Sequence, residues 1–395
     1  MKPGAGERRR LHATFESLCR IPSETGDERA VADWLIRELG AMGLAVEEDD
    51  AATAVDGNAG NLLARIPAGG GDGCRSILLC AHMDTVPLTA RVEPVLVNDG
   101  WENAGEGILG ADNKAAVATL VEAARMLSGS EGLDVGVELL FTVAEETGLH
   151  GAAAFDVGRL HSEFGYVFDH ASPVGEIIVA APTLTKFGAE IRGRAAHAGL
   201  HPELGVSAIA AAARAVVALP QGRLDPETTA NIGTIRGGTA TNVVSERCWL
   251  EAEVRGIDQA RLDAVLTESI DAIQDAVDQA SCDVDITVER LVGGYRVRPR
   301  EPSLELAERA LTAIGHEPRP IISGGGSDAN AFRAAGFPCT NLANGTERAH
   351  EPGERVSSAA LEDGLDLIFA LLDAASEMAP DGTSAGAPQG GGIDP

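Results

Sequence analysis

Cysteine is scarce in this sequence, and long apolar runs are absent. The six cysteines form no C-x-x-C pair and show no regular spacing; they are Cys19, Cys74, Cys80, Cys248, Cys282 and Cys339. Such scattered cysteines argue against a disulfide framework and a structural zinc–thiolate site, and they predict reduced, mostly buried thiols. No apolar run approaches the about 20 residues that a membrane-spanning helix requires, so the sequence predicts no such helix.

Positive charge is also in short supply. Only 31 residues are lysine or arginine, against 60 aspartates and glutamates, and the formal net charge is −29. Nucleic acids and anionic membranes attract basic proteins, so we expect neither as a partner. Residues 1–10 carry a basic flank without the apolar segment that a secretory signal needs, and the expected compartment is therefore the cytoplasm.

The 395-residue chain alternates helical and strand patterns, and 44% of its residues are hydrophobic. Helices are expected within 7–44 and after residue 112, with buried strands at 62–66, in 76–87 and at 135–144. Near-continuous apolar strands that alternate with helices are typical of sheets covered on both faces. The pattern therefore predicts an α/β fold with a sizeable core.

From residue 183 the pattern changes to half-exposed strands and two amphipathic helices. Their order, strand–helix–strand–strand–helix–strand, predicts an inserted α+β domain. We therefore expect a first α/β part at 1–182, the insert at 183–294 and a second α/β part at 295–379. Residues 380–395 are rich in Gly, Pro and Ser, which predicts a disordered tail.

Polar side chains stand at the ends of several predicted strands. In the stretch 76–87, SILLCAHMDTVP, an apolar strand ends in His82 and Asp84. Residues two apart on a strand point the same way, so both side chains would project together from its carboxyl end. Open α/β sheets place ligand sites at that end. Taken alone, the pair could also be a buried histidine beside a strand-ending acid.

Further acids and a second histidine follow in the same way. Asp112 stands between a Gly-rich approach and a helix, where a plain helix N-cap would also stand. Glu145 and Glu146 end the strand at 135–144, and Asp169 ends another strand near 166–168. His350 lies in a late loop. Each group by itself also has a bland explanation, because acids at strand ends are often simply solvated.

Together these residues have the composition of a metal site. Histidine with several carboxylates suits zinc, manganese or cobalt better than a thiolate site would. Two histidines and three carboxylates are enough for two ions that share one bridging carboxylate. In such a site one of two adjacent acids can bind a cation while its neighbour transfers protons.

As a set, the motifs resemble the M20 family of metallopeptidases, from the first helices to the last one. The matching motifs are 81–87 (AHMDTVP), 110–114 (GADNK), 145–148 (EETG), Asp169, 196–199 (AHAG), 237–243 (GGTATNV) and 350–352 (HEP). Within the family the chain is similar to the peptidase T-like branch, because its fourth acidic position is Asp169 rather than Glu. The resemblance implies a mixed-sheet zinc-exopeptidase catalytic domain with an inserted lid that also dimerises.

The resemblance also implies roles for the strand-end residues. One metal would be held by His82, Asp112 and Asp169, and the other by Asp112, Glu146 and His350. Asp112 would then bridge the two ions, and a cis peptide would follow it. Glu145 would be the general base that takes a proton from the attacking water and then protonates the leaving amine. Asp84 would orient the ring of His82.

Substrate contacts are expected from the insert and from a late glycine-rich turn. His197 would donate to the carbonyl oxygen that becomes an oxyanion, and its alternative is a surface loop histidine. Asn242 and Arg236 are weaker candidates for holding polar ends of the substrate. Gly325 and Ser327 could offer backbone N–H groups to a substrate carboxylate, although a plain tight turn explains them as well.

One departure from the branch affects specificity. Glycines typically follow the fourth acid there, whereas this chain has His170, Ala171, Ser172 and Pro173. This change would reshape the pocket that reads the free amine of the substrate, so strict tripeptidase specificity does not follow from the motifs.

The expected function is a metallo-aminopeptidase that hydrolyses the N-terminal bond of short peptides. It would use two zinc ions per subunit, with manganese or cobalt as alternatives, and act as a homodimer through the insert. One alternative is a deacylase that cleaves N-acyl amino acids with the same site. The other is a non-catalytic binding protein on the same fold.

Overall fold

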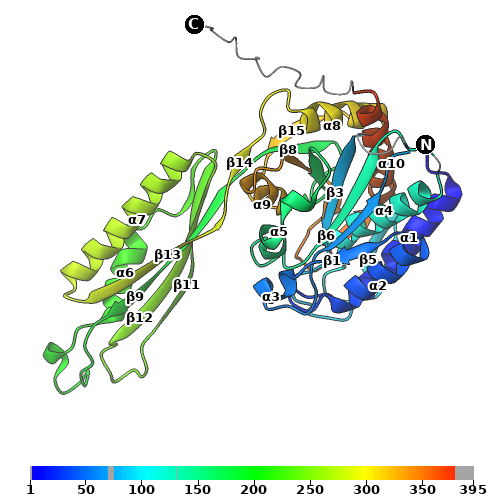
Figure 1. Ribbon diagram of the computed structural model, residues 1–395. Coiled ribbons are helices and arrows are strands. Elements are labelled where there is room, and N and C mark those ends of the chain that lie inside the picture. Colours follow the sequence, from blue (N-terminus) through cyan, green and yellow to red (C-terminus); the bar gives the residue numbers. More distant parts are fainter. Residues whose placement is uncertain (1, 70–74, 131, 379–395) are drawn as a thin grey trace, which may run out of the picture.

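The computed structural model describes residues 2–69, 75–130 and 132–378, which form a large body and a smaller, elongated body (Figure 1). The chain leaves the large body between β8 (Glu176–Ala181) and β9 (Thr183–Arg192) and returns between β13 (Asp283–Val292) and β14 (Tyr295–Arg296). The predicted boundaries at 182/183 and 294/295 fall at these two crossings. The predicted tail at 380–395 lies outside the described residues.

A mixed nine-stranded sheet forms the centre of the large body. Its path is β1-β2-β6-β3-β7-β16-β8-β14, and β15 pairs with β8. The remaining strands are β1 (Val46–Glu48), β2 (Leu62–Ile66), β3 (Ser76–His82), β6 (Gly136–Thr142), β7 (Gly165–Val167), β15 (Arg319–Ile322) and β16 (Cys339–Leu342). Neighbours along β6-β3-β7-β16 are parallel, so their carboxyl ends meet at one edge of the sheet.

Helices cover both faces of this sheet, which confirms the predicted α/β class. Alternate residues of β3 show the two layers, because Leu79 packs into one core while Leu78 and Cys80 pack into another. The first core includes α1 (Ala5–Cys19), α2 (Arg29–Ala41), α4 (Ala111–Ser128), α8 (Pro302–Ala313) and α10 (Ser358–Ser376). The second includes residues of α5 (His150–Ala154) and α9 (Asp328–Ala334). Burial on both faces explains why these strands are apolar throughout.

The small body is one antiparallel sheet with two helices. Its strand order is β10-β11-β12-β9-β13, and its core lies between the sheet and the helices α6 and α7. The elements not yet bounded are α6 (Ala208–Ala218), β10 (Gly222–Asp225), β11 (Thr228–Gly237), β12 (Arg247–Gly256) and α7 (Gln259–Gln279). The sequence patterns missed β10, since its four residues show no apolar alternation.

A separate four-stranded sheet forms from segments within 94–103 and 346–357, for which the sequence patterns predicted no strands. Here β4 (Pro94–Val97) and β5 (Gly100–Asn103) form a hairpin, and β5 pairs with β18 (Arg355–Ser357), which pairs with β17 (Thr346–Glu347). The strands that stabilise this hairpin are about 250 residues distant in the sequence. No local pattern could therefore reveal the sheet. The short helix α3 (Ala51–Val55) was also missed.

Two smaller expectations can be compared with the structure. The peptide bond between Asp112 and Asn113 is cis, as predicted. Burial of the thiols is confirmed for the five described cysteines, which are free, whereas Cys74 lies outside the described residues. Among the described helices, none combines the length and the hydropathy that crossing a bilayer requires.

Candidate metal centre

The five predicted metal ligands come together at the carboxyl edge of the parallel strands. His82 ends β3, Glu146 follows β6, and Asp169 follows β7. Asp112 lies at the start of α4, and His350 lies between β17 and β18. Residues separated by up to 268 positions therefore meet at one edge, as the topology of a parallel sheet requires.

The five side chains form two overlapping trios. In the first trio, His82 Nε2 lies 3.4 Å from Asp112 Oδ1 and 3.5 Å from Asp169 Oδ1. In the second, His350 Nε2 lies 3.0 Å from Glu146 Oε1 and 3.4 Å from Asp112 Oδ2. Within each trio the ligand atoms lie within 4.8 Å of one another. Asp112 thus turns one carboxylate oxygen toward each trio.

The donor set fits two divalent ions of the zinc type. One imidazole nitrogen and two carboxylates in each trio match the nitrogen and oxygen ligands that zinc takes in hydrolytic sites. Asp112 Oδ1 is also buried without a hydrogen-bond donor among the described residues. A buried carboxylate oxygen left in this way is costly unless a cation or a donor approaches it. The arrangement therefore provides a place for a bound cation.

Hydrogen bonding sets the tautomer of His82. Its Nδ1 lies 2.9 Å from the backbone carbonyl oxygen of Asp84 and 3.4 Å from the Asp84 carboxylate. A carbonyl can only accept, so Nδ1 carries a proton, and a neutral ring in this orientation would present the lone pair of Nε2 to a metal ion. The predicted orienting contact of Asp84 is therefore made mainly by its backbone.

Glu354 holds the backbone around Asp112 in place, and no local sequence pattern predicts this contact. Its Oε2 accepts from the N–H groups of Leu109 and Gly110, both at 2.7 Å, and its Oε1 accepts from Asp112 N–H at 2.9 Å. Glu354 is 1% exposed, and burial raises its pKa to about 7. Its position two residues after the 350–352 motif was the only available signal, because a lone glutamate in a loop has no pattern.

Without bound metal, burial and the neighbouring charged groups together set the pKa values of the residues in this site. Burial opposes ionisation of His82, but the carboxylates of Asp169, Asp112 and Asp84 raise its pKa well above the usual range. Burial and the nearby carboxylate of Asp169 raise the pKa of Glu145. Asp112 behaves in the opposite way, since the rings of His350 and His82, each 3.4 Å from one of its carboxylate oxygens, outweigh burial and lower its pKa.

The substrate-binding residues predicted in the insert do not lie beside the cluster of proposed metal ligands of the same chain. His197, Asn242 and Arg236 are all exposed on the small body. Strand β9 has ten residues, spans about 33 Å and starts at the crossing, and His197 follows its far end. The structure thus places these three residues well away from the metal ligands.

The hydrogen bonds of the glycine-rich turn at residues 324–327 favour the interpretation as a plain tight turn over that of a substrate-binding loop. Gly325 N–H donates to Ser323 Oγ at 3.0 Å, and Ser327 N–H donates to Asn330 Oδ1 at 3.1 Å. Both N–H groups predicted to bind a substrate carboxylate are therefore used inside the protein. Asn330 Nδ2 also donates to the carbonyl oxygens of Gly293 and Pro182, so the start of α9 is tied to both crossings.

Comparisons with known proteins agree with this geometry. The family model described as peptidase family M20/M25/M40 matches residues 78–374 of the chain. The protein YqjE of Bacillus subtilis is 36% identical over 370 residues, which cover 93% of this chain and 99% of YqjE. A Vibrio cholerae protein named Peptidase T is 24% identical over 408 residues, which cover 92% of this chain and 96% of that protein.

Two solved structures are similar over nearly the whole chain. The aminopeptidase PepT from Bacillus cereus has a TM-score of 0.84 and 37% identity, with 94% of this chain and 99% of that chain covered. A tripeptidase from Staphylococcus aureus has a TM-score of 0.88 and 32% identity, with the same coverage of both chains. The fold and the two-body arrangement are therefore shared with these proteins.

We predict an unusual titration of His350 in the metal-free protein. Hydrogen bonds with Asp112 and Glu146 raise the pKa of His350 to about 10. This value exceeds the unfolded pKa of about 6.5, so the stabilisation is complete below pH ~6.5 and is lost as pH rises through about 10. Side-chain NMR of the metal-free protein should show a ring that stays protonated through neutral pH.

The variant Asp112→Asn should lower this pKa, because it removes the negative charge beside the ring. Asp363→Asn is the matched control, since Asp363 bonds His316 instead at 2.9 Å. A His350 ring that titrates between pH 6 and 7 in all three proteins would contradict the assignment of its partners.

Proposed function

We propose that this chain, which belongs to peptidase family M20/M25/M40, is a two-metal aminopeptidase that removes the N-terminal residue of short peptides. One observation carries the proposal: Asp112 is shared between two ligand trios, with Glu145 beside one of them. The similar structures named as an aminopeptidase and a tripeptidase support the substrate class. A cytoplasmic location belongs to the proposal and rests on the sequence.

Zinc is the proposed metal. His82, Asp112 and Asp169 would hold one ion, while Asp112, Glu146 and His350 would hold the other. When bound, such a pair of ions polarises the scissile carbonyl and lowers the pKa of a water, which supplies a nucleophile at neutral pH. Manganese and cobalt accept the same ligand types.

Glu145 is the proposed general base and acid. It is 9% exposed and follows the same strand as Glu146, so its carboxylate lies beside the metal ligands without belonging to either of the two proposed trios. Burial raises the pKa of Glu145, and a carboxylate with a raised pKa is a stronger base. Glu145 would take a proton from the attacking water and deliver it to the amine that leaves.

The small body is proposed as a lid that brings His197 to the substrate carbonyl. His197 is exposed, its Nδ1 accepts from the N–H groups of Gly199 and Leu200, and its Nε2 is left to donate to an oxyanion. A homodimer through this body is part of the proposal, because the family resemblance implies one. The ten-residue strand β13 lies at the edge of the small sheet, where another strand could pair.

A panel of peptides tests the substrate class. Di-, tri- and tetrapeptides of alanine and their N-acetylated forms would be incubated with the protein plus zinc, manganese or cobalt, and again after chelation. We expect metal-dependent release of the N-terminal residue from free peptides only, measured by chromatography. Cleavage of the acetylated set alone would instead identify a deacylase, and no turnover with two metals bound would favour a binding protein.

The variant Glu145→Gln tests the role of the base. Loss of proton transfer should lower kcat about 10²–10⁴-fold, while elemental analysis still finds two metals per chain. Glu163→Gln is the control, since Glu163 is 58% exposed and lies outside both trios. Retained activity in Glu145→Gln would remove Glu145 from the mechanism.

The variant His197→Ala tests the role of the small body. Loss of one oxyanion donor typically costs about 10²–10³-fold in kcat, and we expect this loss with an unchanged metal content. His201→Ala is the matched control, because His201 is exposed four residues further on and pairs with Glu203. Equal kcat values for the two variants would show that His197 does not reach the substrate.

A further inference from the structure

Four consecutive backbone N–H groups after β6 all donate to side-chain oxygens from other parts of the chain. Val143 N–H donates to Asn61 Oδ1 at 3.1 Å, and Ala144 N–H donates to Glu28 Oε1 at 3.1 Å. The N–H groups of Glu145 and Glu146 donate to the two oxygens of Asp84, at 3.0 and 3.1 Å. We call residues 143–146 the base segment, since it carries the general base Glu145 and the metal ligand Glu146.

The base segment needs these partners because it belongs to no helix or strand. Strand β6 ends at Thr142, and Ala144 has a φ of +51°, so the backbone turns away from the sheet at once. Buried N–H groups are nearly always hydrogen-bonded, and here the sheet no longer supplies acceptors. Three side chains replace the missing strand partner.

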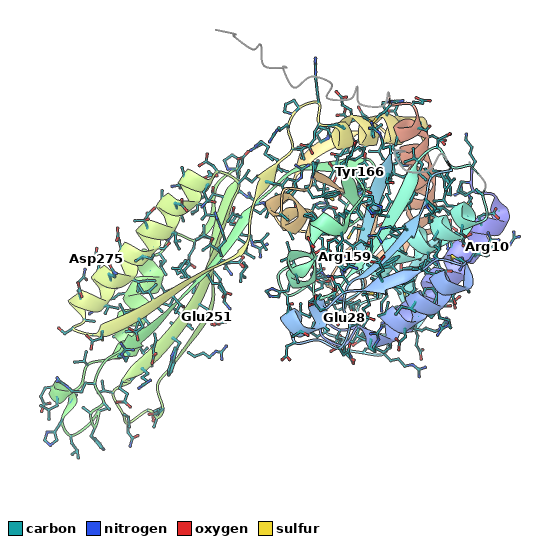
Figure 2. The ribbon with its side chains drawn as sticks, in the orientation of Figure 1. Arg10, Glu28, Arg159, Tyr166, Glu251 and Asp275 are labelled. Atoms are coloured by element: carbon teal, nitrogen blue, oxygen red, sulfur yellow. The ribbon has the colours of Figure 1, made fainter. Side chains whose placement is uncertain are left out.

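Glu28 holds the middle of the base segment. Glu28, which is labelled in the large body in Figure 2, is fully buried. It stands at the N-cap position of α2, yet its side chain makes no capping bond. Instead, Oε1 accepts from Gly26 N–H at 3.0 Å and from Ala144 N–H, 116 residues further along the chain. An acid buried in this way costs free energy unless it is well bonded. Its contact with the residue before Glu145 suggests a functional reason for its presence.

Asn61 links Val143 to Gly151, because its side chain hydrogen-bonds the backbone of both residues. Its Nδ2 donates to the carbonyl oxygen of Gly151 at 2.9 Å and to Asp49 Oδ2 at 2.8 Å, while its Oδ1 accepts from Val143 N–H. Gly151 approaches Val143 so closely that a Cβ there would lie 1.9 Å from the Val143 carbonyl oxygen. The base segment is therefore clamped between Asn61 and the turn that follows it.

We propose that Glu28 and Asn61 are positioning residues for Glu145 and Glu146. They act through the backbone, and neither belongs to a candidate group of metal ligands among the described residues. With Asp84, they fix four successive amides and so set the direction of both side chains. This inference rests on the proposed function for its effect on turnover, but its effects on the backbone and on metal affinity do not depend on which substrate is cleaved.

The test compares Glu28→Ala with Glu28→Gln. Alanine removes the acceptor for Ala144 N–H, whereas glutamine keeps an oxygen in the same place. Hydrogen exchange measured by mass spectrometry should show faster exchange in peptides that contain 143–146 for the alanine variant only. Competition with a chromogenic chelator should show weaker binding of one zinc ion, by about 10–100-fold. With the peptide substrate, kcat should fall by a similar factor while KM changes little.

Glu138 provides a matched control. It is 2% exposed on β6 and also accepts backbone N–H groups, those of His161 and Ser162 at 2.9 and 2.8 Å. Glu138→Ala therefore removes a buried acid that also accepts backbone N–H groups, together with its ion pair with Arg65 at 2.9 Å, and keeps the four side-chain acceptors of the base segment. We expect it to lower thermal stability without changing exchange at 143–146 or zinc affinity. Asn61→Ala should behave like Glu28→Ala, and it keeps the test valid if Glu28→Ala does not fold.

Each outcome decides between the proposals. If exchange and zinc affinity change as expected but no peptide is cleaved, the positioning role stands and the proposed function fails. If peptides are cleaved but Glu28→Ala matches Glu138→Ala in exchange, zinc affinity and kcat, Glu28 is a structural residue only. An equal loss in Glu28→Gln and Glu28→Ala would also overturn the proposal, because the acceptor oxygen would then not be what matters.

Discussion

The structure depends on holding four carboxylates together in a small, mostly buried region. Asp112, Glu145, Glu146 and Asp169 repel one another, and burial adds to the cost of ionising them. His82 and His350 offset part of this cost, as the raised pKa values of both histidines show. Two divalent cations would offset the rest. The surrounding apolar sheet supplies the rigidity that keeps such a cluster from spreading apart.

Backbone amides are the second means by which the protein organises this negative charge. Glu354 accepts from three N–H groups around Asp112, and Glu28, Asn61 and Asp84 accept from four around Glu145. Asp112 has non-helical φ and ψ at the start of α4, and residues 143–146 belong to no helix or strand. Side chains from distant segments therefore accept the backbone hydrogen bonds that a helix or sheet would otherwise accept. The carboxylates of Asp112, Glu145 and Glu146 are not used for these backbone contacts.

The division into two bodies separates metal binding from the proposed contacts with substrate. All five proposed ligands belong to the large body, whereas His197, Asn242 and Arg236 belong to the small one. The two crossings pass beside each other, where Gly294 N–H donates to Thr183 Oγ1 and Asn330 binds both. Both crossings are thus hydrogen-bonded to each other or to α9, and Asp328 at the start of α9 accepts from Thr142 at the end of β6.

The choice of five proposed metal ligands came from the family resemblance. The sequence by itself determined the α/β class, the strands at 62–66 and in 76–87, and the polar candidate residues at strand ends. Those features follow from local apolar periodicity and from polar residues at strand ends, which need no knowledge of distant partners. Only the tertiary structure decided that Glu28, Asn61 and Glu354 support the site, and that the β4–β5 hairpin pairs with β18. Their partners are tens to hundreds of residues away, and a lone buried acid or amide carries no periodic signal. Hydrogen bonds between such distant groups exist only once the chain has folded.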